Sequence, residues 1–161
     1  MQHITLLCVG KLSERFFADG VAEYAKRLGA LCQFDVVEIS EEAINEKNAS
    51  AATEAKALEK EGARLLAALP KGAKLVALCV EGQQKPSPGL AAYLREAALS
   101  GQGDVAFAIG SSHGLCDAVK QRADLRLSLS EMTLPHQMAR LVLTEQIYRA
   151  FMIQNGGKYH K

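Results

Sequence analysis

The chain has 161 residues, of which 48% are hydrophobic and 23% are charged. That length and composition fit one compact domain, predicted over residues 1–161, and exclude a disordered tail. With 19 lysines and arginines against 18 acidic residues, the formal net charge is +1. This balance excludes nucleic-acid binding through bulk charge and leaves only a local basic patch for it.

Two further patterns bear on compartment and metal content. Residues 1–8 lack a basic leader and a small-residue cleavage site, and the longest apolar runs, such as Leu75–Val80, are too short to span a bilayer. Four widely spaced cysteines form no Cys-x-x-Cys pair: Cys8, Cys32, Cys79 and Cys116. We therefore expect buried free thiols in a reducing cytoplasm, with no membrane anchor and no metal site.

Short apolar runs alternate with longer amphipathic stretches, a pattern typical of an α/β protein. Most short runs are apolar throughout, as strands buried on both faces require, so we predict a parallel sheet with helices on both faces. In chain order, the first predicted elements are a strand at Ile4–Val9, a helix from Ser13 to Gly29, a strand at Phe34–Ile39, a mobile polar loop from Ser40 to Ser50, and a helix from Ser50 to Pro70. They are followed by a strand at Leu75–Val80, a helix capped by Ser87 and ending at Gly101, a strand at Val105–Ile109, a short helix at Cys116–Ala123, a strand at Leu125–Leu129, and a helix at His136–Ile153.

Ligands of open α/β sheets bind outside the carboxyl ends of the strands. Gly10, Gly82 and Gly110 follow three of the predicted strands, and each permits a tight turn or a close approach of backbone to a small molecule. No Gly-x-Gly-x-x-Gly fingerprint or P-loop follows the first strand, so a nicotinamide enzyme or an NTPase is not expected. In the last predicted helix, Glu145 interrupts an apolar side, which indicates an interface or a site.

The segment Gly110–Gly114 matches Gly-x-Ser-x-Gly between a strand and a helix, the setting of a hydrolase nucleophile. Ser112 would be the nucleophile, with Asp117 or Asp124 and then His136 as its partners. A chain of this length leaves little room for the usual hydrolase sheet, and two serines between glycines also suit a ligand-binding loop. A serine hydrolase is therefore kept as the lesser alternative.

The stretch Leu125–His136 joins a strand to a helix through a polar turn that exposes backbone groups. An adenine ring suits such a turn, because main-chain N–H and C=O groups can match its edge while Leu129, Met132 and Leu134 pack on its faces. The alternative is a plain connection in which Thr133 caps the last helix.

The sequence resembles the RlmH family over essentially the whole chain. The similarity lies in Val9–Lys11, in Ile109-Gly110 with its turn to Gly114-Leu115, in Met132–Arg140 leading into Glu145–Ala150, and in Tyr159–Lys161. Those proteins are small SPOUT-class methyltransferases that modify N3 of a pseudouridine in the 23S ribosomal RNA of the large subunit, with S-adenosyl-L-methionine as the cofactor. The resemblance implies a C-terminal trefoil knot, a homodimer, and ribosomal RNA in the large subunit or assembled ribosome as the partner.

The resemblance also implies a cofactor site at particular positions of this chain. Those positions are Leu78, Gly110, Leu129, Ser130, Glu131, Met132, Thr133 and Leu134. Ser111 departs from the family, which commonly has a second glycine there, and its side chain is expected to narrow the pocket.

Basic residues concentrate in the C-terminal part of the chain. Residues 120–161 hold 7 basic and 3 acidic residues, net +4, whereas the first 119 hold 12 basic and 15 acidic, net −3. The C-terminal part is therefore predicted to contact RNA phosphates. Arg140 is the favoured RNA-binding residue because it lies one helical turn beyond His136. The basic candidates are Arg122, Arg126, Arg140, Arg149, Lys158 and Lys161.

Methylation of an imide nitrogen requires alignment of donor and acceptor and removal of a proton. His136 and His160 are candidates for the base or an orienting group, and the rings of Tyr159 and His160 can stack on a base. We hypothesise that the tail, Gly156–Lys161, becomes ordered over the acceptor base, with its glycine pair as a hinge. In one arrangement the tail reaches across the dimer interface to do so. An RNA-binding dimer with a decayed cofactor pocket is the third functional alternative.

Overall fold

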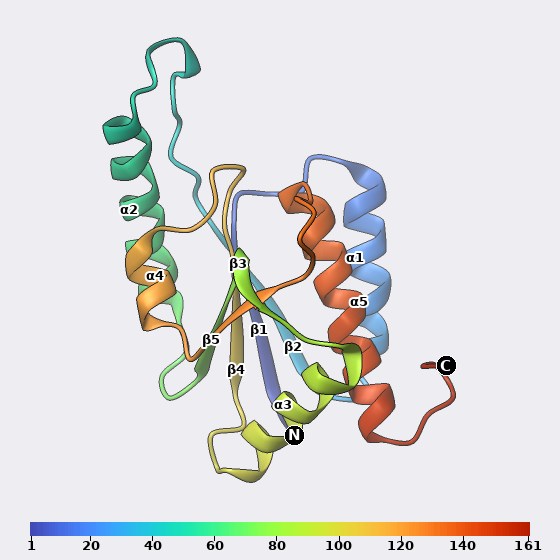
Figure 1. Cartoon of the computed structure of the whole chain (residues 1–161). Coiled ribbons are helices and arrows are strands. Elements are labelled where there is room, and N and C mark those ends of the chain that lie inside the picture. The colour runs from blue at the N-terminus through green and yellow to red at the C-terminus, as the bar shows by residue number, and fades with distance from the viewer.

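A computed structural model describes all residues of the chain, from Met1 to Lys161 (Figure 1). Its strands form one parallel sheet in the order β2-β1-β4-β3-β5, which confirms the predicted parallel sheet. In chain order the elements are β1 His3–Val9, α1 Arg15–Leu28, β2 Gln33–Ile39, the 3-10 helix η1 Glu46–Asn48, α2 Ala51–Ala68, β3 Lys74–Gln84, α3 Ser87–Leu99, β4 Val105–Ile109, α4 Asp117–Arg122, β5 Leu125–Ser128 and α5 His136–Gln154.

The helices cover both faces of the sheet, as predicted. Side chains of a strand point alternately to its two faces. In β1, Ile4 and Leu6 therefore pack in the core formed with α1, α3 and α5, while Leu7 and Val9 pack in a second core with α2 and α4. Figure 1 shows α1 and α5 on one side of the strands and α2 and α4 on the other. The two cores hold the sheet's carboxyl-end loops on a rigid base.

Two strands differ from the prediction. The edge strand β2 pairs only with β1 and is largely exposed, not buried on both faces. The strand β3 runs on to Gln84 because it pairs with β5 twice, through Leu78 and again through Gln83, with a register break between them. Gly82 lies in this break, and a Cβ there would collide with the backbone of Arg126 and Leu127. Glycine thus permits the close approach of two backbones here, whereas its predicted role was a tight turn or a close approach of backbone to a small molecule.

Helix boundaries correct two expectations about caps. Ser87 is the first residue of α3 and Pro86 precedes it, so Ser87 is not the cap. The helix α5 begins at His136 after Pro135, so Thr133 does not cap it. In both cases a proline takes the flanking position and offers no side-chain oxygen for capping.

The polar loop after β2, predicted to be mobile, contacts α2 at its start. It contains the short helix η1, which no sequence periodicity predicted. At its start, Arg64 donates a hydrogen bond to Ser40 O at 2.9 Å and forms an ion pair with Glu42. Side chains of α2 therefore anchor the loop at this end.

The cysteines are free, as predicted, and three are buried while Cys79 is half-buried. No helix has the length and apolar character needed to cross a bilayer. No group of three or more histidine, cysteine, aspartate or glutamate side chains is placed to hold a metal ion. The trefoil knot stays a prediction from the resemblance.

Candidate functional site

A cavity of about 300 Å³ lies at the carboxyl ends of β3, β4 and β5, where ligands of α/β sheets bind. The structure brings nearly all the predicted cofactor residues to its lining: Leu78, Gly110, Leu129, Ser130, Met132, Thr133 and Leu134. Glu131 is exposed and does not line it. His136, the first residue of α5, also lines this cavity. Of the other two glycines expected at this rim, neither Gly10 nor Gly82 lines the cavity.

One wall of the cavity is the tight turn from Gly110 to Gly114. Gly114 has φ +87 and donates from its backbone N to Ser111 O at 2.9 Å. A Cβ on Gly110 would overlap the Gly114 carbonyl. The turn therefore needs glycine at both ends, and it places main-chain groups at the cavity surface.

Ser111, which departs from the family pattern, lines the cavity and is only 6% exposed. Its hydroxyl donates to Glu61 Oε1 at 3.4 Å and accepts from His113 N at 3.4 Å. The hydroxyl is thus engaged with the protein rather than free in the cavity.

Another wall of the cavity is the loop between β5 and α5. Ser128 Oγ donates to Ser130 O at 3.0 Å, and Ser130 Oγ accepts from Met132 N at 3.0 Å. No backbone-to-backbone hydrogen bond involves Leu129–Leu134. Most main-chain donors and acceptors of this loop are therefore available to a ligand, which fits the recognition of an adenine edge by backbone.

The geometry does not support the serine hydrolase. Ser112 is exposed and its hydroxyl makes no hydrogen bond to a histidine or carboxylate. The Asp124 carboxylate is already used, accepting from Leu75 N at 2.8 Å and pairing with Arg122. Without a base beside the serine, the nucleophile would not be activated.

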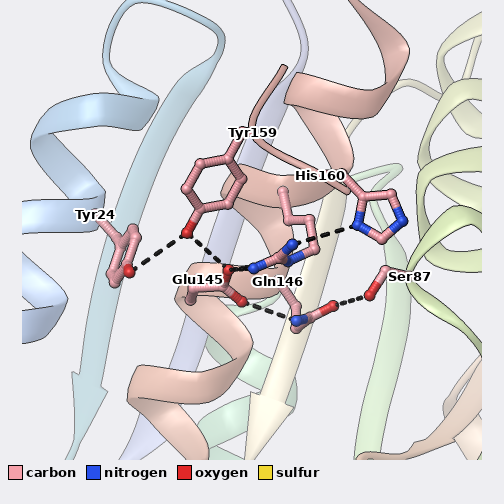
Figure 2. A network of polar contacts seen from close by, with 7 residues as sticks. Tyr24, Ser87, Glu145, Gln146, Tyr159 and His160 are labelled. Carbon is pink, nitrogen blue, oxygen red and sulfur yellow. Dashed lines mark hydrogen bonds and ion pairs between the residues drawn. The ribbon is translucent and has the colours of Figure 1, made fainter. Parts of the chain in front are cut away.

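The other two predicted catalytic residues lie in a separate group, which Figure 2 shows between α1 and α5. Tyr159 Oη donates to Glu145 Oε1 at 2.9 Å and lies 3.5 Å from Tyr24 Oη. Arg149 pairs with the same Glu145 oxygen at 2.6 Å, and its Nη1 lies 3.3 Å from His160 Nδ1. We call these five residues the tail network. Glu145, the charge that interrupts the helix, is its centre.

Burial raises the pKa of the Tyr159 phenol well above its usual value, and the contacts with Tyr24 and Glu145 act in the same direction. Tyr159 is therefore a neutral hydrogen-bond donor at physiological pH. Neither Tyr159 nor His160 lines the cavity. Within one chain, the structure brings His136 to the cavity and leaves the tail residues apart from it.

Arg140 corrects the expectation of an RNA contact. Its side chain is only 3% exposed, and it donates to Glu38 Oε2 at 2.8 Å and to Gly10 O at 3.1 Å. It lies on the buried side of α5 with Leu143 and Ile147, at helical spacing. Its charge joins α5 to the ends of β1 and β2 and does not face solvent. Lys161 is exposed at the end of the tail.

Sequence reasoning missed several partners of these groups. Tyr24 and Glu61 were not singled out for any polar role, and Ser87 was interpreted only as a cap, although its Oγ donates to Gln146 Oε1 at 2.6 Å. Each contact joins segments far apart in the chain, so helical or strand periodicity carries no signal for it. The one available signal was Glu145, a charge on an apolar helix side.

Comparison with known proteins agrees with this geometry. A family model described as "Predicted SPOUT methyltransferase" matches residues 2–160. The chain is 48% identical over 160 residues to "Ribosomal RNA large subunit methyltransferase H" of Pelotomaculum thermopropionicum, covering 99% of each chain. It is 47% identical over 158 residues to the protein of that name from Streptococcus thermophilus, covering 98% of this chain and 99% of that one.

A solved structure shares the fold at low sequence identity. The crystal structure of a probable methyltransferase from Bordetella pertussis Tohama I matches with a TM-score of 0.55 and 15% identity, over 93% of this chain and 96% of that one. On the strength of the family model and the full-length relatives, this chain belongs to the SPOUT methyltransferase family.

Proposed function

We propose that this protein transfers a methyl group from S-adenosyl-L-methionine to N3 of a pseudouridine in the 23S ribosomal RNA of the large subunit. The observation that carries the proposal is the carboxyl-end cavity, whose β5–α5 wall offers unpaired main-chain groups. The relatives' name, which specifies the ribosomal RNA of the large subunit, supports the substrate class. A cytoplasmic location follows from that substrate.

The cavity residues fit the proposed cofactor in chemistry and position. When bound, S-adenosyl-L-methionine supplies a methyl group activated by a positively charged sulfur. The backbone of Leu129–Leu134 would hold the adenine edge, and Leu78, Leu129 and Leu134 would pack on its faces. The turn at Gly110 lets the backbone approach the ligand closely.

His136 is the proposed catalytic group within the same chain as the cavity. It is half-buried at the start of α5 and lines the cavity wall. A histidine ring there can accept the N3 proton through an unprotonated ring nitrogen or orient the base by a hydrogen bond. Its main contribution would be to hold the acceptor in line for displacement.

The tail residues Tyr159 and His160 are proposed to act on the substrate of a second copy of the chain. They do not line the cavity of their own chain, and their network lies on the α1–α5 side of the molecule. A homodimer that apposes this side to a partner's cavity would complete the active site. Arg149 and Tyr159 would then enter as a preformed pair, because Glu145 orients both.

Phosphate contacts are proposed for the exposed basic residues of the C-terminal part. Four of these residues are exposed: Arg122, Arg126, Lys158 and Lys161. Each would contribute a salt-sensitive, sequence-independent contact to ribosomal RNA, either in the large subunit or in the assembled ribosome.

The proposal is tested by mass spectrometry of ribosomal RNA from a strain lacking the gene. We expect one pseudouridine of the 23S RNA to lose one methyl group, and the gene supplied in trans to restore it. Unchanged RNA would contradict the proposal. Calorimetry with S-adenosyl-L-methionine separates the remaining alternative, because an RNA-binding dimer with a decayed pocket would give no heat of binding.

A further inference from the structure

Glu61 is a buried carboxylate in the middle of α2 that belongs neither to the cavity lining nor to the tail network. It is 3% exposed, and no lysine or arginine forms an ion pair with it. Burial raises the pKa of its carboxyl group, and the negative charges of Glu41 and Glu42 act in the same direction. Placing such a group in the interior opposes folding, and an apolar side chain would serve packing better.

The two carboxylate oxygens hold two different loops. Oε2 accepts from the backbone N of Glu42 at 2.9 Å, which fixes the start of the polar loop after β2. Oε1 accepts from Ser111 Oγ at 3.4 Å, and Ser111 Oγ in turn accepts from His113 N at 3.4 Å. Ser111 and His113 both line the cavity. A chain of hydrogen bonds thus runs from α2 to the cavity turn.

Close packing beside Glu61 keeps α2 from shifting relative to this turn. A Cβ on the next residue, Gly62, would overlap Cys116 Sγ, and Val119 lies 3.2 Å from the same position. Cys116 lies two residues beyond the turn, immediately before α4, and Val119 lies in α4. The helix therefore contacts the turn at its start through Ser111 and just beyond its end through Cys116.

We infer that Glu61 is a positioning residue that holds the Ser111–His113 side of the cavity in its ligand-binding shape without touching the ligand. The inference rests on the proposed cofactor occupying this cavity. This role explains why α2 has a carboxylate at a buried position where an apolar side chain would stabilise the fold more. The hydroxyl of Ser111 needs an acceptor on the side away from the cavity, and Glu61 provides it. The inference also assigns Ser111 a role that its departure from the family pattern left open.

The test measures the affinity of the purified full-length protein for S-adenosyl-L-methionine by calorimetry. The variants are Ser111→Ala, which removes the donor, Glu61→Gln, which keeps the size and removes the charge, and the double variant. Glu59→Gln is the matched control, because Glu59 is an exposed residue of the same helix. Circular dichroism and thermal unfolding establish that each protein is folded.

We expect Ser111→Ala to weaken affinity about fivefold, the effect of losing one hydrogen bond. Glu61→Gln should weaken it by a similar or smaller factor, and the double variant should be no weaker than the more affected single one, because both act through one contact. In methyl-transfer assays, the KM for S-adenosyl-L-methionine should rise by the same factor in each variant. Glu59→Gln should bind as the wild type does.

Folded single variants with unchanged affinity would overturn the inference, and so would effects that multiply in the double variant. A lowered melting temperature with unaltered affinity would show a structural role alone. If Glu61→Gln does not fold, Ser111→Ala decides the matter by itself. Absence of binding by the wild-type protein would overturn the proposed function as well, so the two failures are distinguishable.

Discussion

The cavity and the tail network are two regions of one chain built by different means. The cavity walls include the turn Gly110–Gly114 and the loop Leu129–Leu134, and the main chain of this loop makes no backbone-to-backbone hydrogen bond. The tail network is made of side chains, with Glu145 accepting from Arg149 and Tyr159 at 2.6 and 2.9 Å. Our proposal gives cofactor recognition to the cavity and gives the acceptor base to His136 at the cavity together with the tail network.

This difference determines how each region can be broken. A main-chain site depends on backbone shape, so it resists most side-chain changes and fails when a glycine is replaced. A side-chain network depends on individual donors and acceptors, so single truncations weaken it in steps. Substitutions in the two regions should therefore change different measured quantities.

The largest expected effect is on the cavity. Gly110→Ala puts a methyl group onto the Gly114 carbonyl, so the turn must move. We expect affinity for S-adenosyl-L-methionine to fall on the order of 100-fold, because small displacements of a preorganised site are costly. Calorimetry measures it, and Gly103→Ala is the control, since the nearest atom to a Cβ there is 3.6 Å away. Equal affinities of the two variants would contradict the main-chain account.

Deleting Tyr159–Lys161 should give the next largest effect, and the quantity that it lowers is methyl transfer, not cofactor affinity. Methyl transfer to ribosomal RNA should fall by roughly 100-fold through the loss of positioned groups. Affinity for the cofactor should not change, because neither Tyr159 nor His160 lines the cavity. Equal loss of both quantities, or loss of neither, would remove the distinction between the regions.

Tyr159→Phe sharpens the comparison within the tail network. It removes the 2.9 Å hydrogen bond to Glu145 and keeps the ring. We expect methyl transfer to fall about tenfold. The shape of the pH profile should not change, because the raised pKa of Tyr159 keeps the phenol protonated through the assay range. Tyr93→Phe is the control, since the Tyr93 hydroxyl is buried without a partner. A pH profile altered only by Tyr159→Phe would identify the phenol as a titrating group instead.

The smallest expected effect is on cysteine reactivity. Burial raises the pKa of the Cys8 and Cys32 thiols to about 11, so below that pH they are mainly protonated and unreactive. Cys79 is half-buried and lines the cavity, so iodoacetamide should label it first. Bound S-adenosyl-L-methionine should slow that labelling a few-fold, as peptide mass spectrometry would show. Labelling of Cys8 before Cys79 would contradict the placement of both.

Local patterns in the sequence were sufficient to predict a parallel sheet with helices on both faces. The predicted strand Val105–Ile109 matches β4, and the start predicted for the last helix, His136, matches α5. These predictions succeed because periodicity depends only on near neighbours. The cavity wall after β5 was likewise predicted from a turn rich in exposed backbone.

Polar contacts between distant segments could not be predicted in this way. Arg140 joins Glu38 across 102 positions and Gly10 across 130, so a charge that resembled a surface group is internal. Glu61 and Ser111 are 50 positions apart and meet only because α2 packs beside the turn after β4. Which polar group is buried depends on how helices pack on the sheet, and composition carries no information about that.

The central claim is that the cofactor's nucleoside binds between β5 and α5, held largely by main chain. A crystal structure of the protein grown with S-adenosyl-L-methionine tests it most directly. We predict the adenine edge within hydrogen-bond distance of backbone groups of Leu129–Leu134, with the ligand against Gly110. An empty cavity, a cavity filled by side chains, or a nucleoside bound elsewhere would contradict the account.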